Sequence, residues 1–214
     1  MRRAAVRAQL VAAGVRGKAA GLFDGTAGNL SVRVDELVAI TPSGVDCGAL
    51  RPDLIGWHAL DGTAVDAELR PSSELPLHLA VHAARGPGAV VHTHSPAAAA
   101  VSTLVDELPA VHYYAAALGE VVRVAPYAPF GSAELAAGAV NALGNSAAVL
   151  LAHHGAVTTG PDVADALEAA MNLEWVCDVY LRAAAAGSPR VLDRNQCVQA
   201  SAALAAYRAA RPQT

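Results

Sequence analysis

Two histidine pairs, each at the end of an apolar stretch, could bind one metal ion together. His92 and His94 are separated by one residue and end a β-branched run that is typical of a buried strand. Side chains alternate across a strand, so both imidazoles point to the same side. A second apolar run ends at His153 and His154, and either residue can supply a third nitrogen. Catalytic zinc is bound by three protein ligands with one position open, and the pattern predicts such a site.

A competing pair, His78 and His82, is four residues apart, which places both on one face of a helix. Glu74 lies on the same face, four residues before His78. We favour a structural role for this pair, packed and hydrogen-bonded against a sheet, because no third element is expected to converge on that flank. His58 and His112 are also expected to be structural or at the surface.

Three clusters of small and polar residues could bind a small anion. Each combines a hydroxyl or amide group with a backbone that a ligand can approach closely: Thr26-Ala27-Gly28-Asn29, Thr41-Pro42-Ser43-Gly44 and Pro71-Ser72-Ser73. The third precedes an expected helix, whose N-cap we predict to be a serine and whose free N–H groups favour an anion. None is a Walker or Rossmann fingerprint, so nucleotide binding is not supported. Glu74 follows directly and could act as a general acid or base, or complement the helix dipole.

The composition is that of one globular domain, which we place over residues 1–214. Hydrophobic residues make up 54% and aromatic residues 4%, so the core must consist mainly of Ala, Val and Leu. The expected helices cover 2–20, from Ser73 to about 85, 96–105, 133–143, 162–186 and 194–210, and the expected strands cover 30–34, 37–40, 54–60, 89–94, 121–125 and 147–152. This mixture predicts an α/β or α+β fold.

Charge and cysteine usage exclude several classes of function. The net charge is −4 and no basic stripe is present, which argues against nucleic acid as a partner. Residues 135–161 carry no charged side chain, but their glycines, asparagines and histidines argue against a membrane span. Cys47, Cys177 and Cys197 form no close pair, and reduced thiols in the cytoplasm fit them better than a disulfide framework.

Taken in order, the motifs resemble the class II aldolase/adducin family, especially its L-fuculose-1-phosphate aldolase branch. The matching segments are 25–31, 40–44, 71–74, 90–94, 125–127 with 130–131, and 153–155. The resemblance implies a central, largely antiparallel sheet flanked by helices. It also implies a homotetramer in the cytoplasm with its sites at the subunit interfaces.

The same resemblance implies a role for individual residues. His92, His94 and His154 are the implied ligands of Zn²⁺ or another divalent cation, with His154 chosen because it directly precedes Gly155. Glu74 is implied as the catalytic acid or base and as a further metal ligand in the resting state. The implied phosphate-binding group comprises Thr26, Gly28, Asn29, Ser43, Gly44, Ser72 and Ser73.

Three aromatic residues complete the implied site. Tyr113 matches a catalytic tyrosine that reaches the site of a neighbouring subunit. Phe130 and Tyr207 match positions that line the aldehyde pocket. Two residues depart from the family pattern: Thr93 between the strand histidines, and His153, which could tune the metal site or compete as a ligand.

The implied reaction is cleavage of a ketose 1-phosphate, such as L-fuculose 1-phosphate, to dihydroxyacetone phosphate and an aldehyde. The cleavage leaves an enediolate whose charge must be stabilised. A Schiff-base aldolase would need a desolvated lysine, and Lys18, the only lysine, lies in the expected N-terminal helix away from every polar cluster. A Lewis-acid metal is therefore expected to stabilise the enediolate.

Other activities of the family remain open at this stage. A pentulose-5-phosphate 4-epimerase uses related chemistry but usually carries Asp where this chain has Glu74, and a sugar-phosphate dehydratase is a further alternative. A non-enzymatic adducin-like scaffold is disfavoured because such members lack the three ligand histidines. A zinc hydrolase would not explain the three small-residue loops.

Overall fold

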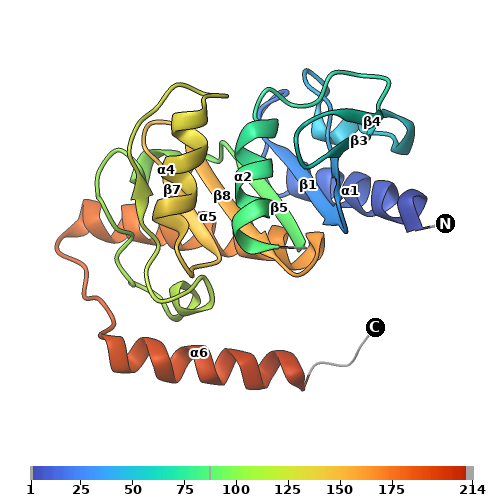
Figure 1. The fold of residues 1–214 in the computed structure, drawn as a ribbon. Helices are drawn as coiled ribbons and strands as arrows, with labels where there is room; N and C mark the ends of the chain where they lie inside the picture. The colour runs from blue at the N-terminus through green and yellow to red at the C-terminus, as the bar shows by residue number, and fades with distance from the viewer. Residues whose placement is uncertain (1, 87, 211–214) are drawn as a thin grey trace.

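The computed structural model describes residues 2–86 and 88–210, and one eight-stranded sheet forms its centre (Figure 1). The strands are β1 (Asn29–Val34), β2 (Leu37–Ile40), β3 (Gly56–Ala59), β4 (Ala64–Asp66), β5 (Gly88–Thr93), β6 (Val124–Ala125), β7 (Ala148–Leu151) and β8 (Gly155–Gly160). Their order across the sheet is β4-β3-β2-β1-β5-β8-β7-β6. Neighbouring strands are antiparallel except β6 and β7, which confirms the expected, largely antiparallel sheet.

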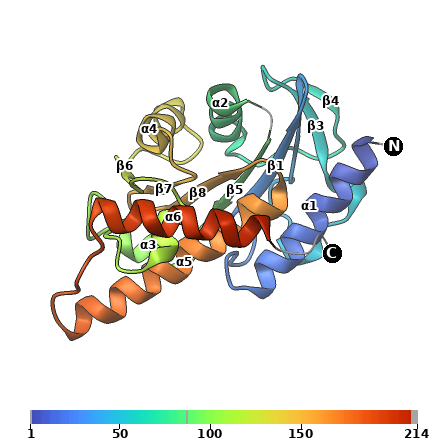
Figure 2. The same ribbon diagram turned by 90° about the horizontal axis from the view of Figure 1, so that it is seen from below.

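Helices cover both faces of this sheet (Figure 2). On one face, α1 (Arg2–Ala19) and α5 (Val163–Ala186) bury Leu10 and Leu167 in a shared apolar cluster. On the other face, α2 (Leu75–Arg85) and α4 (Ala133–Leu143) bury Val81 and Leu135. The adjacent residues Val90 and Val91 of β5 belong to opposite clusters, as strand alternation requires. The central strands are therefore buried on both sides.

The remaining helices are short or peripheral. They are α3 (Pro96–Val101), three 3-10 helices at Cys47–Ala49, Pro52–Leu54 and Tyr113–Ala117, and α6 (Arg194–Ala209). Helix α6 lies apart from the sheet in Figure 1 and has no buried residue. It is tied to the rest of the chain by ion pairs from Arg194 to Glu120 at 2.6 Å and from Arg208 to Glu168 at 3.2 Å.

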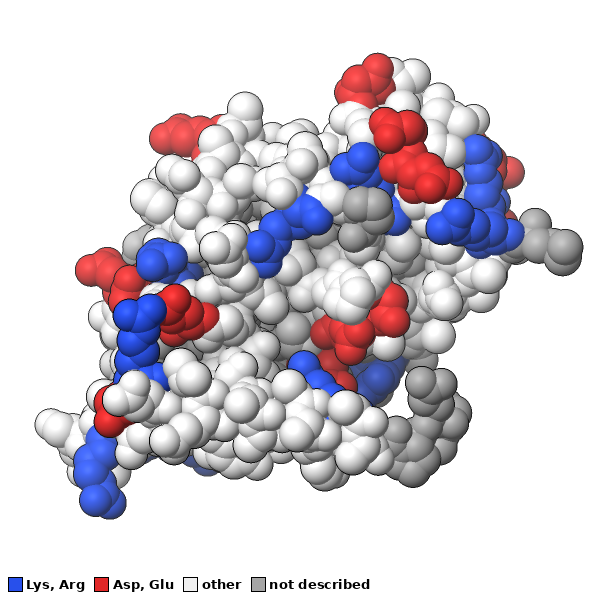
Figure 3. Space-filling model, turned by 60° about the horizontal axis from the view of Figure 1, so that its bottom comes forward, with Lys and Arg blue, Asp and Glu red and all other residues white. Residues whose placement is uncertain are grey.

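On the face drawn in Figure 3, basic and acidic side chains are interspersed and form no single basic stripe. Among residues 2–86 and 88–210, no helix is long and apolar enough to cross a membrane. All three cysteines are free thiols, and Cys47 and Cys177 are buried.

Strand β8 is the main departure from the predicted elements. The sequence pattern predicts no strand over 155–160. In the structure β8 lies between β5 and β7, and β7 and β8 form a hairpin. The third histidine therefore comes from the hairpin turn, where His153 adopts a left-handed φ of 58°.

Smaller differences lie at the ends of elements. Strand β4 was not predicted, α3 stops at Val101, and the strand predicted over 121–125 contains only Val124 and Ala125. The N-cap of α2 is Glu74 and not a serine. By contrast, α4 has the predicted bounds, and α1, α5 and α6 match within two residues.

Gly155 allows β8 to lie close to the end of β5, beside His94. A Cβ atom at this position would lie 2.1 Å from the carbonyl oxygen of Thr93, a backbone atom that cannot rotate away. A Cβ atom added at Gly138, in the middle of α4, would have no such neighbour within 4 Å. The two glycines therefore form a matched pair for a stability test.

We predict that Gly155→Ala lowers the free energy of unfolding by about 1–3 kcal/mol, because the added methyl group overpacks the strand pair. Gly138→Ala should raise it by about 0.5–1 kcal/mol, because alanine is the better helix residue. Urea unfolding of both variants measures the difference. Equal stability of the two variants would contradict the packing described here.

Candidate metal centre and anion pocket

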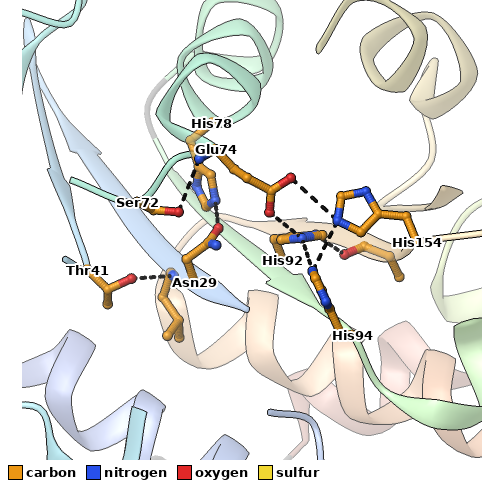
Figure 4. A network of polar contacts seen from close by, with 10 residues as sticks. Asn29, Thr41, Ser72, Glu74, His78, His92, His94 and His154 are labelled. Carbon is orange, nitrogen blue, oxygen red and sulfur yellow. Dashed lines mark hydrogen bonds and ion pairs between the residues drawn. The ribbon is translucent and has the colours of Figure 1, made fainter. Parts of the chain in front are cut away.

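Four side chains converge on one point at the end of β5 (Figure 4). The ligand atoms of Glu74, His92, His94 and His154 all lie within 4.8 Å of one another. The Nε2 atom of His94 is 2.9 Å from that of His92 and 3.0 Å from that of His154. The Glu74 carboxylate is 2.6 Å from His92 Nε2 and 3.5 Å from His154 Nε2. This cluster is the predicted set of metal ligands, brought together from three separate elements.

Each element has a local reason to present its ligand. His92 is in β5, and His94 follows directly after this strand, so the two side chains lie on the same side. His154 lies in the hairpin turn between β7 and β8. Glu74 occupies the N-cap position of α2, but its side chain makes no capping hydrogen bond. Instead the Ser72 hydroxyl accepts from the Glu74 N–H at 3.2 Å, which leaves the carboxylate free to point into the cluster.

The hydrogen bonds around the cluster suit a cation. His92 Nδ1 lies 2.9 Å from the Ala156 carbonyl oxygen, which can only accept, so Nδ1 donates and Nε2 is the ring nitrogen that faces the cluster. Glu74 Oε1 is buried and has no hydrogen-bond partner. Tetrahedral zinc with Zn–N bonds of 2.0–2.1 Å places its nitrogen ligands roughly 3.3 Å apart, close to the separations here. The residues present therefore fit a divalent cation.

Protonation of the cluster also favours metal binding. Burial, together with the adjacent His92 and His154, lowers the pKa of His94 to about 4. Burial lowers the pKa of His154 as well. For Glu74, burial acts to raise the pKa, but His92 outweighs it through its charge and hydrogen bond, and the pKa falls to about 2. Near neutral pH, His94 and His154 are neutral ligands beside an ionised carboxylate.

A pocket of about 230 Å³ lies beside the cluster. Its lining includes all seven predicted phosphate-binding residues, three residues of the metal cluster, and Phe130. The complete lining is Thr26, Ala27, Gly28, Asn29, Pro42, Ser43, Gly44, Ser72, Ser73, Glu74, His94, Phe130 and His154. The three small-residue loops thus meet in space as expected. No lysine or arginine lines the pocket, so an anion would be held by hydroxyl and amide groups and by a cation at the cluster.

Backbone hydrogen bonds hold the three loops together. Thr41 is central: its carbonyl oxygen accepts from Ser72 N at 3.2 Å, and its hydroxyl accepts from Leu30 N at 3.2 Å. Ser43 N donates to Arg70 O at 3.0 Å. Within residues 2–86 and 88–210, the backbone N–H groups of Gly44 and Ser73 have no protein acceptor. These free donors are what an anion would bind.

Two of the predicted aromatic residues do not line this pocket in the same chain. Tyr113 is 46% exposed and lies in the 3-10 helix Tyr113–Ala117. Tyr207, in α6, is 62% exposed. The pKa of the Tyr113 hydroxyl is raised, mainly by its hydrogen bond with Tyr114 and to a smaller extent by Tyr207. Phe130 lines the pocket and is 74% exposed. The structure therefore brings Phe130 to the metal cluster and leaves both tyrosines elsewhere on the surface.

The competing candidates have structural roles. His78 and His82 are buried and hydrogen-bond to Ser31 of the sheet, as favoured above. His58 is buried, and the ring nitrogen of His112 accepts from Tyr114 N. Two hydrogen-bond partners were not predicted from the sequence: the Ala156 carbonyl, which contacts His92, and the Ser31 hydroxyl, which contacts His78 and His82. Only the alternation of β1 would have hinted that Ser31 faces α2.

Lys18 is not available for Schiff-base chemistry. Its ammonium group lies 2.8 Å from the Asp46 carboxylate, and this hydrogen bond raises the pKa of Lys18. A Schiff-base lysine needs the opposite shift, because its neutral amine is the nucleophile. Lys18 also lies outside the residues that line the anion pocket.

This chain is similar in sequence and in fold to known proteins. Residues 8–181 match the Class II Aldolase and Adducin N-terminal domain. The 5-deoxy-D-ribulose 1-phosphate aldolase of Bacillus thuringiensis is 38% identical over 89% of this chain and 91% of its own. The 5-methylthioribulose-1-phosphate/5-deoxyribulose-1-phosphate aldolase of Rhodospirillum rubrum is 38% identical over 91% of this chain and 88% of its own. A solved L-fuculose 1-phosphate aldolase superposes with a TM-score of 0.88 at 33% identity, covering 94% of this chain and 96% of its own.

The geometry makes a clear prediction about the two adjacent histidines. His154→Ala should abolish stoichiometric binding of Zn²⁺, because it removes one of three converging nitrogens, whereas His153→Ala should keep one ion per chain. Metal content after dialysis, measured by elemental analysis, distinguishes them. Retention of the ion by His154→Ala and its loss from His153→Ala would assign the ligand to His153 instead.

Proposed function

The chain belongs to the class II aldolase and adducin family and is an aldolase, a carbon–carbon lyase; we propose that it cleaves a ketose 1-phosphate to dihydroxyacetone phosphate and a small aldehyde. One observation carries the proposal: a four-ligand metal cluster opens directly onto a pocket of neutral anion-binding groups. A phosphate in that pocket would hold the carbon chain of the sugar beside the cluster. This arrangement suits a substrate that carries its phosphate near the bond that breaks.

We propose Zn²⁺ as the metal, held by His92, His94 and His154, with Glu74 as a fourth ligand in the resting state. Nitrogen-rich sets with one carboxylate are typical of zinc, although Mn²⁺ or Co²⁺ would also fit. The bound cation would supply Lewis-acid stabilisation of the negative charge that develops on the C2 and C3 oxygens of the sugar. The ion pair of Lys18 with Asp46 supports this chemistry over a Schiff base.

The residues of the pocket would position the substrate. The phosphate would accept hydrogen bonds from the backbone N–H groups of Gly44 and Ser73 and from the side chains of Asn29, Ser43 and Ser72. These donors are neutral and lie in loops that are fixed to one another, so they cost little to order on binding. Thr26 and Gly28 would complete the wall of the pocket.

Two side chains would move protons. Cleavage of the C3–C4 bond needs a base to take the proton from the C4 hydroxyl as the aldehyde forms, and the electron pair of the broken bond passes into the enediolate. We assign this role to Tyr113 of a neighbouring subunit in its phenolate form, its own proton having passed to solvent beforehand. Glu74 would then deliver a proton to C3 and so release dihydroxyacetone phosphate. Tyr113 is not among the residues that line the pocket of its own chain, which supports a site shared between subunits, as in a homotetramer.

The substrate class follows from the relatives and the pocket wall. Two relatives are named for 5-deoxyribulose 1-phosphate and a structural neighbour for L-fuculose 1-phosphate. Both sugars end in a methyl group at the end remote from phosphate. Phe130, exposed at the pocket, offers an apolar surface for such a group. We therefore propose a ketose 1-phosphate with a deoxygenated terminal carbon, with Tyr207 of a neighbouring subunit completing the aldehyde pocket.

The direct test is a cleavage assay with 5-deoxyribulose 1-phosphate and L-fuculose 1-phosphate, with release of dihydroxyacetone phosphate as the readout. Activity should disappear after chelation and return on addition of Zn²⁺. A pentulose 5-phosphate should give neither cleavage nor its 4-epimer. Cleavage that is insensitive to chelation, or epimer formation without cleavage, would contradict the proposal.

Glu74→Gln should lower kcat by at least about 100-fold, because general acid–base catalysis contributes that much or more. The three histidines should still retain the metal, so metal content separates a catalytic defect from loss of the ion. Glu107→Gln, at a surface ion pair with Arg123, is the matched control and should keep full activity. Full activity in Glu74→Gln would exclude Glu74 as the catalytic acid.

A further inference from the structure

A buried chain of four polar side chains connects α2 with β1 and ends at the anion pocket. Asn29 Oδ1 lies 2.5 Å from His78 Nε2, and His78 Nδ1 lies 2.6 Å from the Ser31 hydroxyl. The same hydroxyl lies 2.8 Å from His82 Nε2. All four residues are at most 6% exposed. Figure 4 shows His78 and Asn29 meeting beside Glu74 and the three metal-ligand histidines.

The chemistry of the groups allows only one direction for these hydrogen bonds. The amide oxygen of Asn29 can only accept, so His78 Nε2 must donate. The His78 ring is fully buried and contacts only the neutral side chains of Asn29 and Ser31 through its two nitrogens, so one nitrogen carries the proton and Nδ1 must accept. The Ser31 hydroxyl therefore donates to His78 Nδ1 and accepts from His82 Nε2. The direction of each hydrogen bond therefore fixes the direction of the next one.

Asn29, at the end of this series of hydrogen bonds, is the residue that lines the anion pocket. Its oxygen is occupied by His78, whereas within the described part of the chain no hydrogen bond to a protein acceptor is found for its Nδ2 group. Asn29 also lines the pocket of about 230 Å³ that contains the free N–H groups of Gly44 and Ser73. The Nδ2 group, a donor, is therefore the part of the amide that remains for an anion.

We propose that His78, held by Ser31 and His82, is a positioning residue that keeps the amide of Asn29 turned with its N–H groups toward the phosphate of the substrate. The two ends of a carboxamide have the same shape, so without His78 the amide could rotate by half a turn. Its oxygen would then face the phosphate and repel it. The inference rests on the function proposed above, because it specifies how that site recognises a phosphoryl group.

Two substitutions at position 78 separate this role from a merely structural one. The amide nitrogen of glutamine can take the place of Nε2, so His78→Gln keeps a donor toward Asn29. Asparagine is shorter and reaches only the place of Nδ1, so His78→Asn keeps the contact with Ser31 and loses the one with Asn29. Both variants bury one neutral amide in the same site, so a general loss of packing should affect them alike.

We expect His78→Asn to raise the KM for the ketose 1-phosphate by roughly 10-fold or more, the loss typical of a hydrogen bond to a charged group. The dissociation constant of inorganic phosphate, measured by calorimetry on the Zn²⁺-loaded protein, should rise in parallel, and kcat should change less. His78→Gln should restore both constants to within about threefold of the original protein. Unchanged constants in His78→Asn, or equal losses in both variants, would overturn the proposal.

A measurement on the unmodified protein keeps the test independent of variant folding. Nitrogen-15 NMR of histidine-labelled protein should show His78 as the neutral tautomer with its proton on Nε2 from pH 6 to 8. A proton on Nδ1 would reverse the chain of hydrogen bonds and overturn the inference. If the proton is on Nε2 but the cleavage assay fails, only the proposed function is contradicted. If cleavage occurs but the proton is on Nδ1, only this inference is contradicted.

Discussion

The structure depends on the close approach of three imidazole nitrogens to one buried carboxylate. The Nε2 atoms of His92 and His94 are 2.9 Å apart, and Glu74 lies 2.6 Å from His92. These polar groups meet in a buried site, where a low dielectric constant strengthens their electrostatic interactions with one another and with any cation that they bind. The surrounding elements must therefore hold the four side chains close together.

The centre of the sheet supplies that support. His92 is paired with Asn29 of β1 on one side and with Val157 of β8 on the other, so the predicted metal ligand and one residue of the anion pocket are direct neighbours across the strands. Gly155 lets β8 approach the end of β5. The same strand β1 carries Ser31, whose hydroxyl joins the two histidines of α2. The metal cluster and the anion pocket therefore share one scaffold and cannot shift independently.

The aromatic residues Phe130, Tyr113 and Tyr207 are not held by this central scaffold, because they lie at the surface. Phe130 lines the pocket of its own chain, whereas Tyr113 and Tyr207 lie on the 3-10 helix Tyr113–Ala117 and on α6. Helix α6 buries none of its own residues, so this chain alone does not fix its position strongly. A second subunit that covers this surface would bring the tyrosines to a neighbouring pocket, which is the arrangement that we propose.

Short spacings in the sequence were enough to predict histidine and glutamate as ligands, to pair His92 with His94 and to identify the three small-residue loops. Local periodicity was enough to predict most of the helices. Alternation could not decide between His153 and His154, and it did not reveal β8, since a central strand buried on both faces lacks a polar side. The tertiary structure was needed to show that His154 lies in a hairpin turn and that the Glu74 side chain does not cap its helix. It was also needed to show that His78 hydrogen-bonds to Asn29. These are contacts between residues far apart in the chain, which local patterns do not encode.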